Sequence, residues 1–251
     1  MTAISFITDN GRLSAEFLQD KLEDSQLIDL RGKGLLRNWV DRHFHDYSGH
    51  IFIMSLGIVY RMIAGHITNK YQDPAVVVVD DARRYAISAL SGHEGGANAL
   101  TWKVSALVGC EAVISTASDT NRRITMGIGC RRGIGIPAVE KTVMSVLEKH
   151  GLSSHDVRVA ASVDIKRDEQ GLIMAFENMA MPLVFLDSSR IKAFSGFSTP
   201  SKAAMKNLGL PGVSEPCALL LGRRAVLIQP RYAADGVTVA LAREDEQEDV
   251  H

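Results

Sequence analysis

The feature that most constrains the fold is an alternation of short apolar, β-prone runs with segments of helical period. Runs such as Ala75 to Val79 and Val157 to Val163 are bounded by turn residues, and segments with apolar residues every three or four positions follow them. This alternation is typical of βα units around a parallel sheet. We therefore predict an α/β fold, with two α/β domains whose largely parallel sheets are flanked by helices.

The pattern starts again at Ile124, after a polar stretch, and this restart predicts a boundary between domains 1–123 and 124–251. We expect strands at 3–7, 26–30, 50–54, 75–79, 112–115, 124–130, 157–163, 183–186, 225–229 and 237–241. We expect helices at 12–22, 35–44, 57–64, 98–107, 137–149, 169–178, 200–208 and 215–221. Residues from Arg243 onward are acidic and lack an apolar period, so we expect a disordered tail there.

Composition narrows the classes of partner. The chain of 251 residues is 46% hydrophobic and carries 28 basic and 29 acidic residues, for a net charge of -1. Without an overall basic field we expect no nucleic-acid partner, and the apolar runs are too short for a membrane span. The N-terminal residues do not resemble a signal peptide, and the three scattered cysteines form no CxxC pair. We therefore expect a cytoplasmic protein.

Residues 91–98 join an imidazole, a carboxylate, an amide and three glycines at the start of a predicted helix. His93 can act as a general base, with Glu94 or Asn98 orienting it, and successive glycine amides can form an anion-binding nest. The alternative is a structural helix cap, in which Ser91 or Asn98 accepts backbone N–H bonds. The sequence leaves both hypotheses open.

The turn Gly57–Arg61 also follows an apolar run and begins a predicted helix. Ligands of open α/β sheets usually bind beyond the carboxyl ends of the strands. We expect both this turn and the loop 91–98 to face one crevice at that edge of the sheet. The alternative for Gly57–Arg61 is an ordinary turn between strand and helix.

The second domain has its own glycine-rich loop, Gly127–Gly133, between a predicted strand and a helix. Arg131 and Arg132 in this loop can clamp carboxylates bidentately. Arg132 stands where the third glycine of a GxGxxG fingerprint belongs, so a dinucleotide site is disfavoured. Cys130 is either a nucleophile activated by these arginines or a small residue packed at the end of the strand.

Asp164 and Lys166 follow the next predicted strand, at the edge where ligands usually bind. They can contact a substrate or each other, whereas Asp168 and Glu169 are typical of favourable charges in a first helical turn. Ser214 is expected first as a helix N-cap and second as part of a ligand loop.

His43 and His45 have no cysteine or carboxylate partner at metal-ligand spacing. We therefore expect no metal site formed by protein side chains.

Together these motifs resemble the CbiG family. The matching segments, in order along the chain, are Phe52–Arg61, Asp73–Asp80, Leu90–Asn98, Gly127–Gly133, Ala161–Glu169 and Val213–Pro216. Two features depart from the family pattern. The family commonly has a middle domain after a segment like Thr116–Asp119, and this chain lacks that domain. In addition, Glu94 stands where the family motif has an apolar residue.

The resemblance implies the activity of the family's cobalt-precorrin-5A hydrolases, from anaerobic cobalamin biosynthesis. These enzymes open a δ-lactone on a cobalt-containing tetrapyrrole and release acetaldehyde, so the cobalt-precorrin substrate brings the cobalt and no protein-bound cofactor is implied. His93 is the expected base and Asp164 the second acid/base candidate. The expected substrate-binding residues are Gly57, Arg61, Ser91, Gly92, Gly95, Gly96, Asn98, Asp119, Gly129, Arg131, Arg132, Lys166 and Ser214.

Two other functions stay open. A chain without the middle domain can bind a corrinoid intermediate and hand it to neighbouring enzymes without catalysis. The hypothesis of a nucleotide-dependent enzyme is supported by the glycine loops alone. A homodimer and transient contacts with neighbouring pathway enzymes are further expected partners.

Overall fold

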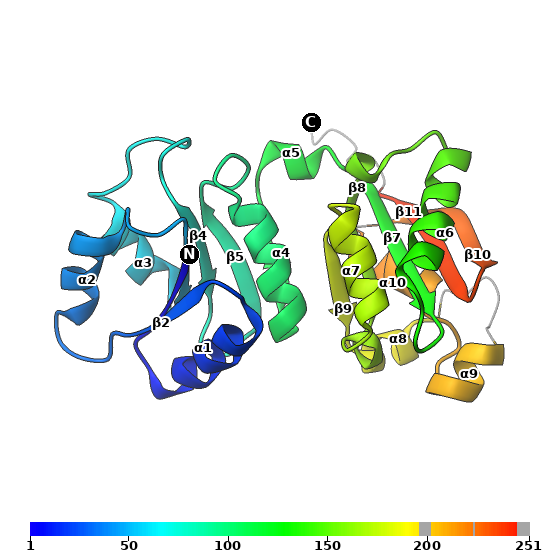
Figure 1. Cartoon of the computed structure of the whole chain (residues 1–251), viewed down its shortest axis with the longest axis horizontal. Helices are drawn as coiled ribbons and strands as arrows, with labels where there is room; N and C mark the ends of the chain where they lie inside the picture. The colour runs from blue at the N-terminus through cyan, green and yellow to red at the C-terminus, as the bar shows by residue number, and fades with distance from the viewer. Residues whose placement is uncertain (196–201, 223, 245–251) are drawn as a thin grey trace. The chain divides into compact units, whose positions relative to one another are not determined.

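The computed structural model describes residues 1–195, 202–222 and 224–244, and the chain forms two compact units (Figure 1). The first is Met1–Asp119 and the second begins at Thr120. Most of the predicted acidic tail, from residue 245 onward, lies outside the described residues, as do residues 200 and 201 of a predicted helix. Arg243, the first residue of the predicted tail, instead ends a strand.

The first unit is a six-stranded sheet in the order β2-β1-β3-β4-β5-β6, with helices on both faces (Figure 1). Its strands are β1 (Thr2–Phe6), β2 (Ser25–Asp29), β3 (Gly49–Ile53), β4 (Ala75–Val79), β5 (Tyr85–Leu90) and β6 (Glu111–Val113). Its helices are α1 (Asp9–Lys21), α2 (Leu35–His43), α3 (Leu56–Ile63), α4 (Ala97–Val108) and α5 (Ala117–Thr120), the last of which reaches the start of the second unit.

Two apolar clusters hold this sheet between its helices. Alternate side chains of β1, β3 and β4 point to opposite faces, which gives each layer of helices its own core. On one face, Leu18 of α1 and Val104 of α4 are fully buried with Ile51. On the other face, Val40 of α2 and Ile63 of α3 pack in a second cluster. Its buried strand residues are Phe52 of β3 and Val76 and Val78 of β4. The first unit is therefore a three-layer α/β structure.

Strand β5 runs opposite to β4 and is joined to it by a tight hairpin. The carboxylate of Asp80 accepts hydrogen bonds from the backbone N–H groups of Arg84 and Tyr85, at 2.7 and 2.8 Å, and closes the turn. Leu90 consequently pairs with Val76, near the start of β4. The loop after β5 thus lies at the amino edge of β1, β3 and β4, and our expectation that it follows their carboxyl ends is wrong.

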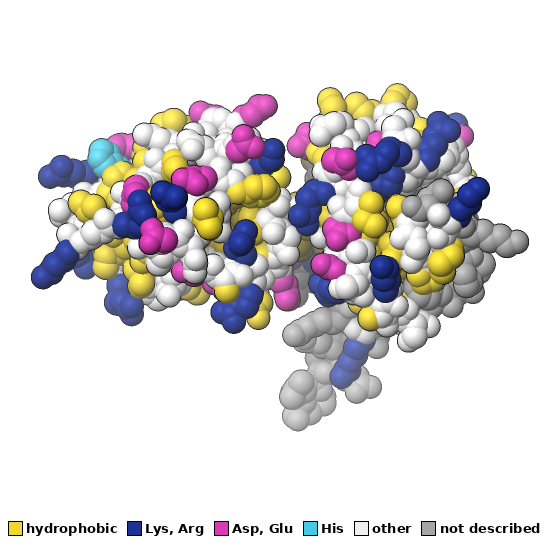
Figure 2. All heavy atoms as spheres, turned by 90° about the horizontal axis from the view of Figure 1, so that it is seen from below, with side chains coloured by type: hydrophobic (Ala, Val, Ile, Leu, Met, Phe, Trp, Pro, Cys, Tyr) yellow, Lys and Arg dark blue, Asp and Glu magenta, His cyan; other side chains and the backbone are white. Residues whose placement is uncertain are grey.

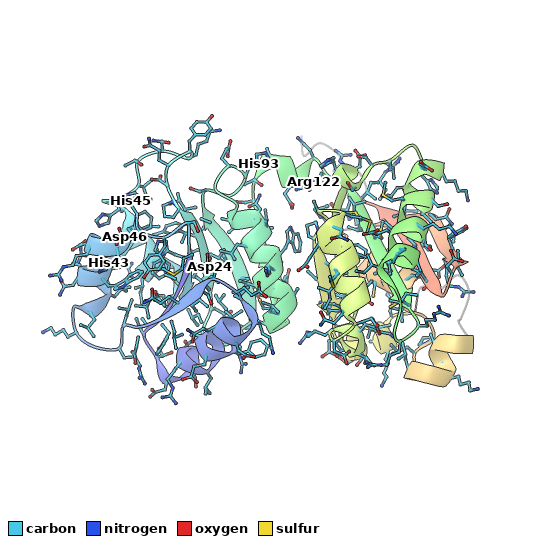
Figure 3. The ribbon with its side chains drawn as sticks, viewed as in Figure 1. Asp24, His43, His45, Asp46, His93 and Arg122 are labelled. Carbon is cyan, nitrogen blue, oxygen red and sulfur yellow. The ribbon has the colours of Figure 1, made fainter. Side chains whose placement is uncertain are left out.

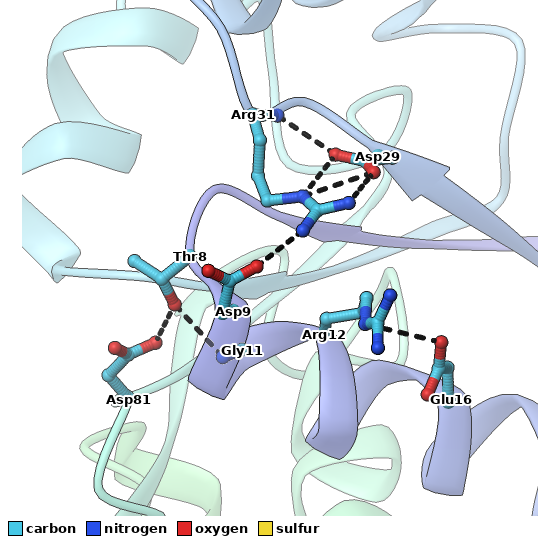
Figure 4. Close-up of polar contacts among 8 residues, drawn as sticks. All are labelled: Thr8, Asp9, Gly11, Arg12, Glu16, Asp29, Arg31 and Asp81. Carbon is cyan, nitrogen blue, oxygen red and sulfur yellow. Dashed lines mark hydrogen bonds and ion pairs between the residues drawn. The ribbon is translucent and has the colours of Figure 1, made fainter.

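The carboxyl edge of β1 and β2 is occupied by a polar network (Figure 4). The Thr8 hydroxyl accepts a hydrogen bond from Gly11 N at 2.9 Å, which begins α1, and donates to the carboxylate of Asp81 at 2.7 Å. The Arg31 guanidinium bonds to Asp29 and Asp9, and its hydrogen bonds lower the pKa of Asp29 to about 2. Arg31 therefore neutralises only part of the negative charge that Asp9, Asp29 and Asp81 bring to this edge.

The second unit is a five-stranded sheet in the order β10-β11-β7-β8-β9. Its strands are β7 (Ile124–Cys130), β8 (Val157–Val163), β9 (Leu183–Leu186), β10 (Val226–Ala234) and β11 (Val237–Arg243). Its helices are α6 (Ile136–Lys149), α7 (Gln170–Asn178), α8 (Ser188–Ala193), α9 (Lys202–Leu208) and α10 (Ser214–Leu221), with single 3₁₀ turns at Ser154–Asp156 and Asp164–Lys166. Strands β7, β8 and β9 are parallel, whereas β10 and β11 form an antiparallel hairpin beside β7.

Helix α10 lies unusually close to β7. A Cβ placed on Gly127 would lie 1.7 Å from the carbonyl oxygen of Ser214, so any side chain at this position would clash with the helix backbone. The hydroxyl of Thr125 also donates to the carbonyl of Ala218 at 2.8 Å. These contacts hold Ser214 to Ala218 of α10 against Thr125 to Gly127 of β7.

The predicted α/β class is confirmed by the two mostly parallel sheets and their flanking helices. Four strands occupy the predicted residues, at 75–79, 124–130, 157–163 and 183–186. The sequence prediction missed β5 and α8, and it ended β10 at Gln229 although the strand continues to Ala234. Among the described residues, none of the helices has the length and hydropathy of a membrane span.

Candidate functional site

The loop between β5 and α4 carries His93, whose side chain is exposed (Figure 3). The neighbouring Glu94 carboxylate binds the Lys70 ammonium at 2.7 Å, and this hydrogen bond holds the pKa of Glu94 below its usual value. The hydrogen bond of Glu94 therefore goes to Lys70 and not to His93. The structure gives no support to the hypothesis that Glu94 orients the imidazole.

The backbone of this loop leaves two amides available. Ala97 N and Asn98 N, at the start of α4, donate to the carbonyls of Ser91 and Gly92, at 3.2 and 2.9 Å. Gly95 N and Gly96 N donate to no atom of the described residues. Two adjacent unbonded amides beside an exposed imidazole are a suitable arrangement for an anion or an oxyanion.

The helix-cap alternative is wrong in its details. The N-cap of α4 is Gly96, in the left-handed region at φ +84°, and no side chain caps the helix. Neither Ser91 nor Asn98 therefore serves as the cap. Gly95 is required by packing, because a Cβ there would lie 2.4 Å from the Cβ of Ser91.

Asn98 is buried beneath the loop and makes two side-chain hydrogen bonds. Its Oδ1 accepts from the hydroxyl of Ser88 on β5, and its Nδ2 donates to the hydroxyl of Thr116, both at 2.8 Å. Asp119, also buried, follows closely, since its backbone N–H donates to the carbonyl of Thr116 at 3.0 Å. The segment after β6 is thus attached to the His93 loop.

Gly57 and Arg61 lie at the other edge of the same sheet. They follow β3, whose last residue, Ile53, pairs with Val79 at the carboxyl end of β4. The His93 loop instead lies at the amino end of β4, because β5 is antiparallel to it. The expected common crevice is therefore not formed within the first unit.

The second unit contains a cavity of about 730 Å³ at the carboxyl ends of β7 and β8. Gly129, Arg131, Arg132 and Lys166 all line it, so the structure brings together four residues that the sequence placed in one site. The other lining residues are Cys130, Val163, Ile165, Ala204, Leu208, Val213, Arg231, Ala233, Ala234, Asp235, Gly236, Val237 and Thr238. The wall is thus mainly apolar, with cationic groups at a few positions.

Lys166 is the most unusual of these cations because it is only 5% exposed. Its Nζ lies 3.5 Å from Oε2 of Glu169 and makes no hydrogen bond within the described part of the chain. Glu169 is equally buried, and its Oε1 accepts a hydrogen bond from Gly133 N at 2.9 Å. Glu169 is therefore a buried counter-ion and not the solvated first-turn charge that the sequence suggested, whereas Asp168 is exposed and pairs with Arg132 at 2.9 Å.

The opposite wall comes from the β10–β11 hairpin. The sequence predicts strands at 225–229 and 237–241, but no site residue was assigned to them. Arg131 N donates to the carbonyl of Gly236 at 2.9 Å, and a Cβ on Gly236 would lie 2.8 Å from Cδ of Arg131. Glycine at this turn therefore lets the arginine side chain lie across the hairpin. The Asp235-Gly236 pair between two β-prone runs is the sequence signal that predicts such a hairpin.

Three further candidates have more restricted surroundings. Asp164 is half-buried and accepts a hydrogen bond from Ile165 N at 2.8 Å, next to the cavity-lining residues. Ser214 is buried as the first residue of α10, whose N-cap is Val213, so the predicted cap is wrong. Burial raises the pKa of the Cys130 thiol to about 11, which favours a packed thiol over a nucleophilic thiolate.

The described residues contain no cluster of three or more His, Cys, Asp or Glu side chains that could hold a metal ion. The His43 imidazole pairs with Asp46 at 2.8 Å near the end of α2, and Figure 3 places both away from His93. Side chains of both charge signs are interspersed on the visible surface of each unit (Figure 2).

Comparisons with known proteins agree with this two-part organisation. The family described as "Cobalamin synthesis G N-terminal" matches residues 38–119, and "Cobalamin synthesis G C-terminus" matches residues 124–242. Protein CobE of Sinorhizobium sp is 31% identical over 47% of this chain and 79% of that protein.

Two longer relatives are named cobalt-precorrin-5A hydrolase. The protein of Priestia megaterium is 25% identical over 83% of this chain and 82% of its own. The protein of Salmonella typhimurium is 24% identical over 90% of each chain. Their alignments extend over 307 and 317 positions, more than the 251 residues of this chain, so the relatives contain residues that this chain lacks. The two matched family regions and these relatives show that the chain belongs to the CbiG family of cobalamin-synthesis proteins.

Proposed function

We propose that this chain is a cobalt-precorrin-5A hydrolase that opens the δ-lactone of its substrate and releases acetaldehyde, giving cobalt-precorrin-5B. Relatives with that name align over more than four-fifths of their length, which supports a hydrolase of cobalamin synthesis. The finer reaction is argued from the chemistry of the two candidate regions. Cobalt enters as part of the substrate, and the proposal requires no cofactor held by the protein.

The observation that carries the proposal is the buried Lys166 ammonium in the cavity of the second unit. Burying a cation is costly, and Glu169 offsets this only through an ion pair of 3.5 Å. A substrate carboxylate can accept the hydrogen bonds that Lys166 does not make within the described protein. Arg131 and Arg231 provide two more cations on the cavity wall. A ligand with several acetate and propionate groups satisfies this arrangement.

The proposed first step is lactone hydrolysis. His93 takes a proton from water as the water oxygen bonds to the lactone carbonyl carbon. The backbone N–H groups of Gly95 and Gly96 donate to the tetrahedral oxyanion. They are suited to this role because they donate to no atom of the described residues. When the oxyanion collapses, the ring C–O bond breaks and the proton held by His93 passes to the departing oxygen. The products of this step are a carboxylic acid, which ionises, and an alcohol.

The second step breaks a carbon–carbon bond. The alcohol gives its proton to a base, its C–O bond becomes the carbonyl of acetaldehyde, and the electron pair of the broken C–C bond moves into the conjugated macrocycle. The macrocycle then takes up one proton, so the step needs no oxidant or reductant. The protein supplies a base and holds the substrate in place.

Asp164 is the alternative base. It lies next to the cavity-lining Ile165 and Lys166, whereas His93 belongs to the other unit. We favour His93, because a neutral imidazole accepts a proton near neutral pH more readily than a carboxylate does. The Asp164 carboxylate also already accepts a hydrogen bond from Ile165 N.

The decisive experiment mixes excess purified full-length protein with cobalt-precorrin-5A under anaerobic conditions. Acetaldehyde is measured by coupling to NADH oxidation, and the corrinoid product by mass spectrometry. We expect one acetaldehyde for each substrate consumed. Tight substrate binding without acetaldehyde would reject the hydrolase and favour the non-catalytic hand-over protein. ATP and NAD, tested by thermal shift, should have no effect, and a shift with either would support the nucleotide-dependent alternative.

A further inference from the structure

The His93 loop is held in a strained conformation. Ser91 has φ +55°, in the left-handed region that non-glycine residues rarely adopt. Ser91 is also buried, and its hydroxyl makes no hydrogen bond within the described residues. Such strain persists only where the surrounding structure determines the conformation. Some other group must therefore fix this loop.

Asn98 makes the contacts that can do so. Its backbone N–H donates to the carbonyl of Gly92 at 2.9 Å, which attaches the start of α4 to the loop. Its side chain joins Ser88 of β5 to Thr116, the residue that precedes α5. One residue thus links the strand before the loop, the loop itself, the helix after it and the chain that follows β6.

Gly92 fits tightly over these hydrogen bonds. A Cβ on Gly92 would lie 2.8 Å from Oδ1 of Asn98 and 2.7 Å from Cγ2 of Thr116. The loop backbone therefore packs directly on the amide of Asn98. A change in that amide would be transmitted to the residues immediately before His93.

We propose that Asn98 is a positioning residue, which holds the strained loop so that His93 and the amides of Gly95 and Gly96 keep their places. The residue is only 7% exposed, and its side-chain oxygen and nitrogen are both hydrogen-bonded within the protein, so it is poorly placed to contact substrate. This inference rests on the proposed function in one respect, namely that His93 takes part in the reaction. It replaces the substrate-binding role that the resemblance implied for Asn98.

The first test compares Asn98→Ala with two variants that each remove one of its partners, Ser88→Ala and Thr116→Val. We expect kcat for acetaldehyde release to fall about tenfold to a hundredfold in Asn98→Ala and less in the other two, with KM nearly unchanged. Thr116→Ser keeps the hydroxyl and should restore most of kcat. Lys70→Met is the matched control, because it removes an exposed contact of the same loop without touching Asn98.

A double-mutant cycle tests whether Asn98 acts through His93. If it does, Asn98→Ala should lower the rate of the wild-type protein but add little to the loss in His93→Gln. Independent, multiplicative losses would overturn the inference. So would a wild-type kcat in a folded Asn98→Ala protein.

Amide hydrogen exchange gives a readout that does not depend on activity. The backbone N–H groups at positions 97 and 98 donate to the carbonyls of Ser91 and Gly92, so their exchange reports on the attachment of the loop. We expect Asn98→Ala to speed exchange at these two positions by at least tenfold while peptides of the second unit are unchanged. Unchanged exchange there would overturn the positioning role even if the protein were active. Faster exchange there in a chain that releases no acetaldehyde would instead reject the proposed function and leave Asn98 as the residue that holds the loop.

Discussion

The His93 loop and the cavity of the second unit are built in opposite ways. In the loop, the candidate base is exposed, and the side-chain oxygen and nitrogen of the buried Asn98 are each hydrogen-bonded to a neighbour. In the cavity, the buried Lys166 makes no hydrogen bond to the described residues and faces a mainly apolar wall. Under the proposed function, this difference would divide the work between the two regions: the first would hold the reacting group, and the second would keep a cation ready for a ligand.

The largest effect that this comparison predicts is on turnover. His93→Gln should lower acetaldehyde release by about 10² to 10⁴ while KM changes little, because a general base contributes that much to the rate. Asp164→Asn should retain much more activity. Glu94→Gln is the control for a charge change in the same loop, since Glu94 bonds to Lys70. A loss confined to Asp164→Asn would place the base in the second unit and break the comparison.

The second-largest predicted effect is a loss of stability of the first unit as the pH falls below 6.5. His50 is buried between Phe44 and Phe52, and burial lowers its pKa from 6.5 to about 4. Above pH 6.5 the imidazole is neutral in both the folded and unfolded chains, so it adds no pH dependence. As the pH falls from 6.5 to 4, only the unfolded chain takes up the proton, and the free energy of unfolding should fall by up to about 3 kcal/mol.

Urea unfolding at several pH values, followed by hydrogen exchange in each unit, measures this loss. In His50→Phe, the first unit should lose much less stability between pH 6.5 and 4. His43→Gln, which changes an exposed imidazole, should behave like the wild type. Equal acid sensitivity of wild type and His50→Phe would show that other groups control it.

A smaller effect is expected on substrate binding. Lys166→Met should raise KM by about 10- to 100-fold with little change in kcat, since hydrogen bonds to charged groups contribute about 1.5 to 3 kcal/mol. Arg132→Met removes a cation that is exposed and already paired with Asp168, so it should have a weaker effect. Titration of the inactive His93→Gln protein with substrate measures the same difference as a dissociation constant. Equal effects in the two variants would show that the buried Lys166 ammonium contributes no more to substrate binding than an exposed cation does.

The smallest predicted effects compare a glycine of the His93 loop with one that follows the cavity-lining Arg132. Gly96 and Gly133 both have φ in the left-handed region, at +84° and +71°, and a Cβ on either would meet no atom within 4 Å. Alanine at each position should therefore cost only the backbone strain, about 1 kcal/mol of stability. A much larger loss at Gly96, measured by urea unfolding, would show that the His93 loop tolerates less adjustment than the loop after β7.

Much of the fold follows from patterns that the sequence displays openly. The strand Ala75–Val79 is an unbroken apolar run and is buried at every residue, so its bounds could be predicted. Strand β5 could not, because only Ala86 of its residues is fully buried and the apolar alternation is weak. Missing this one antiparallel strand placed the His93 loop at the wrong edge of the sheet. The direction of a strand depends on its pairing, which the sequence does not display.

The sequence predicts one wall of the cavity but not the other. Arg131 and Lys166 come directly after strands, where the edge rule for parallel sheets locates ligands. Arg231 belongs to an exposed edge strand that continues through Pro230, a residue that only an edge position tolerates well, and Asp235 lies in the turn after that strand. Asn98 was identified as important, but its role depends on partners ten and eighteen residues away in the sequence.

The reversal of β5 also determines where the chain can be lengthened. Because β6 is parallel to β5, the segment that leaves β6 through Thr116 emerges at the edge that carries His93. A segment inserted between residues 119 and 124 would begin beside this loop and would interrupt no strand of either sheet. In the evolution of such proteins, a module gained or lost at that junction would change the surroundings of the imidazole while both folding cores stayed intact.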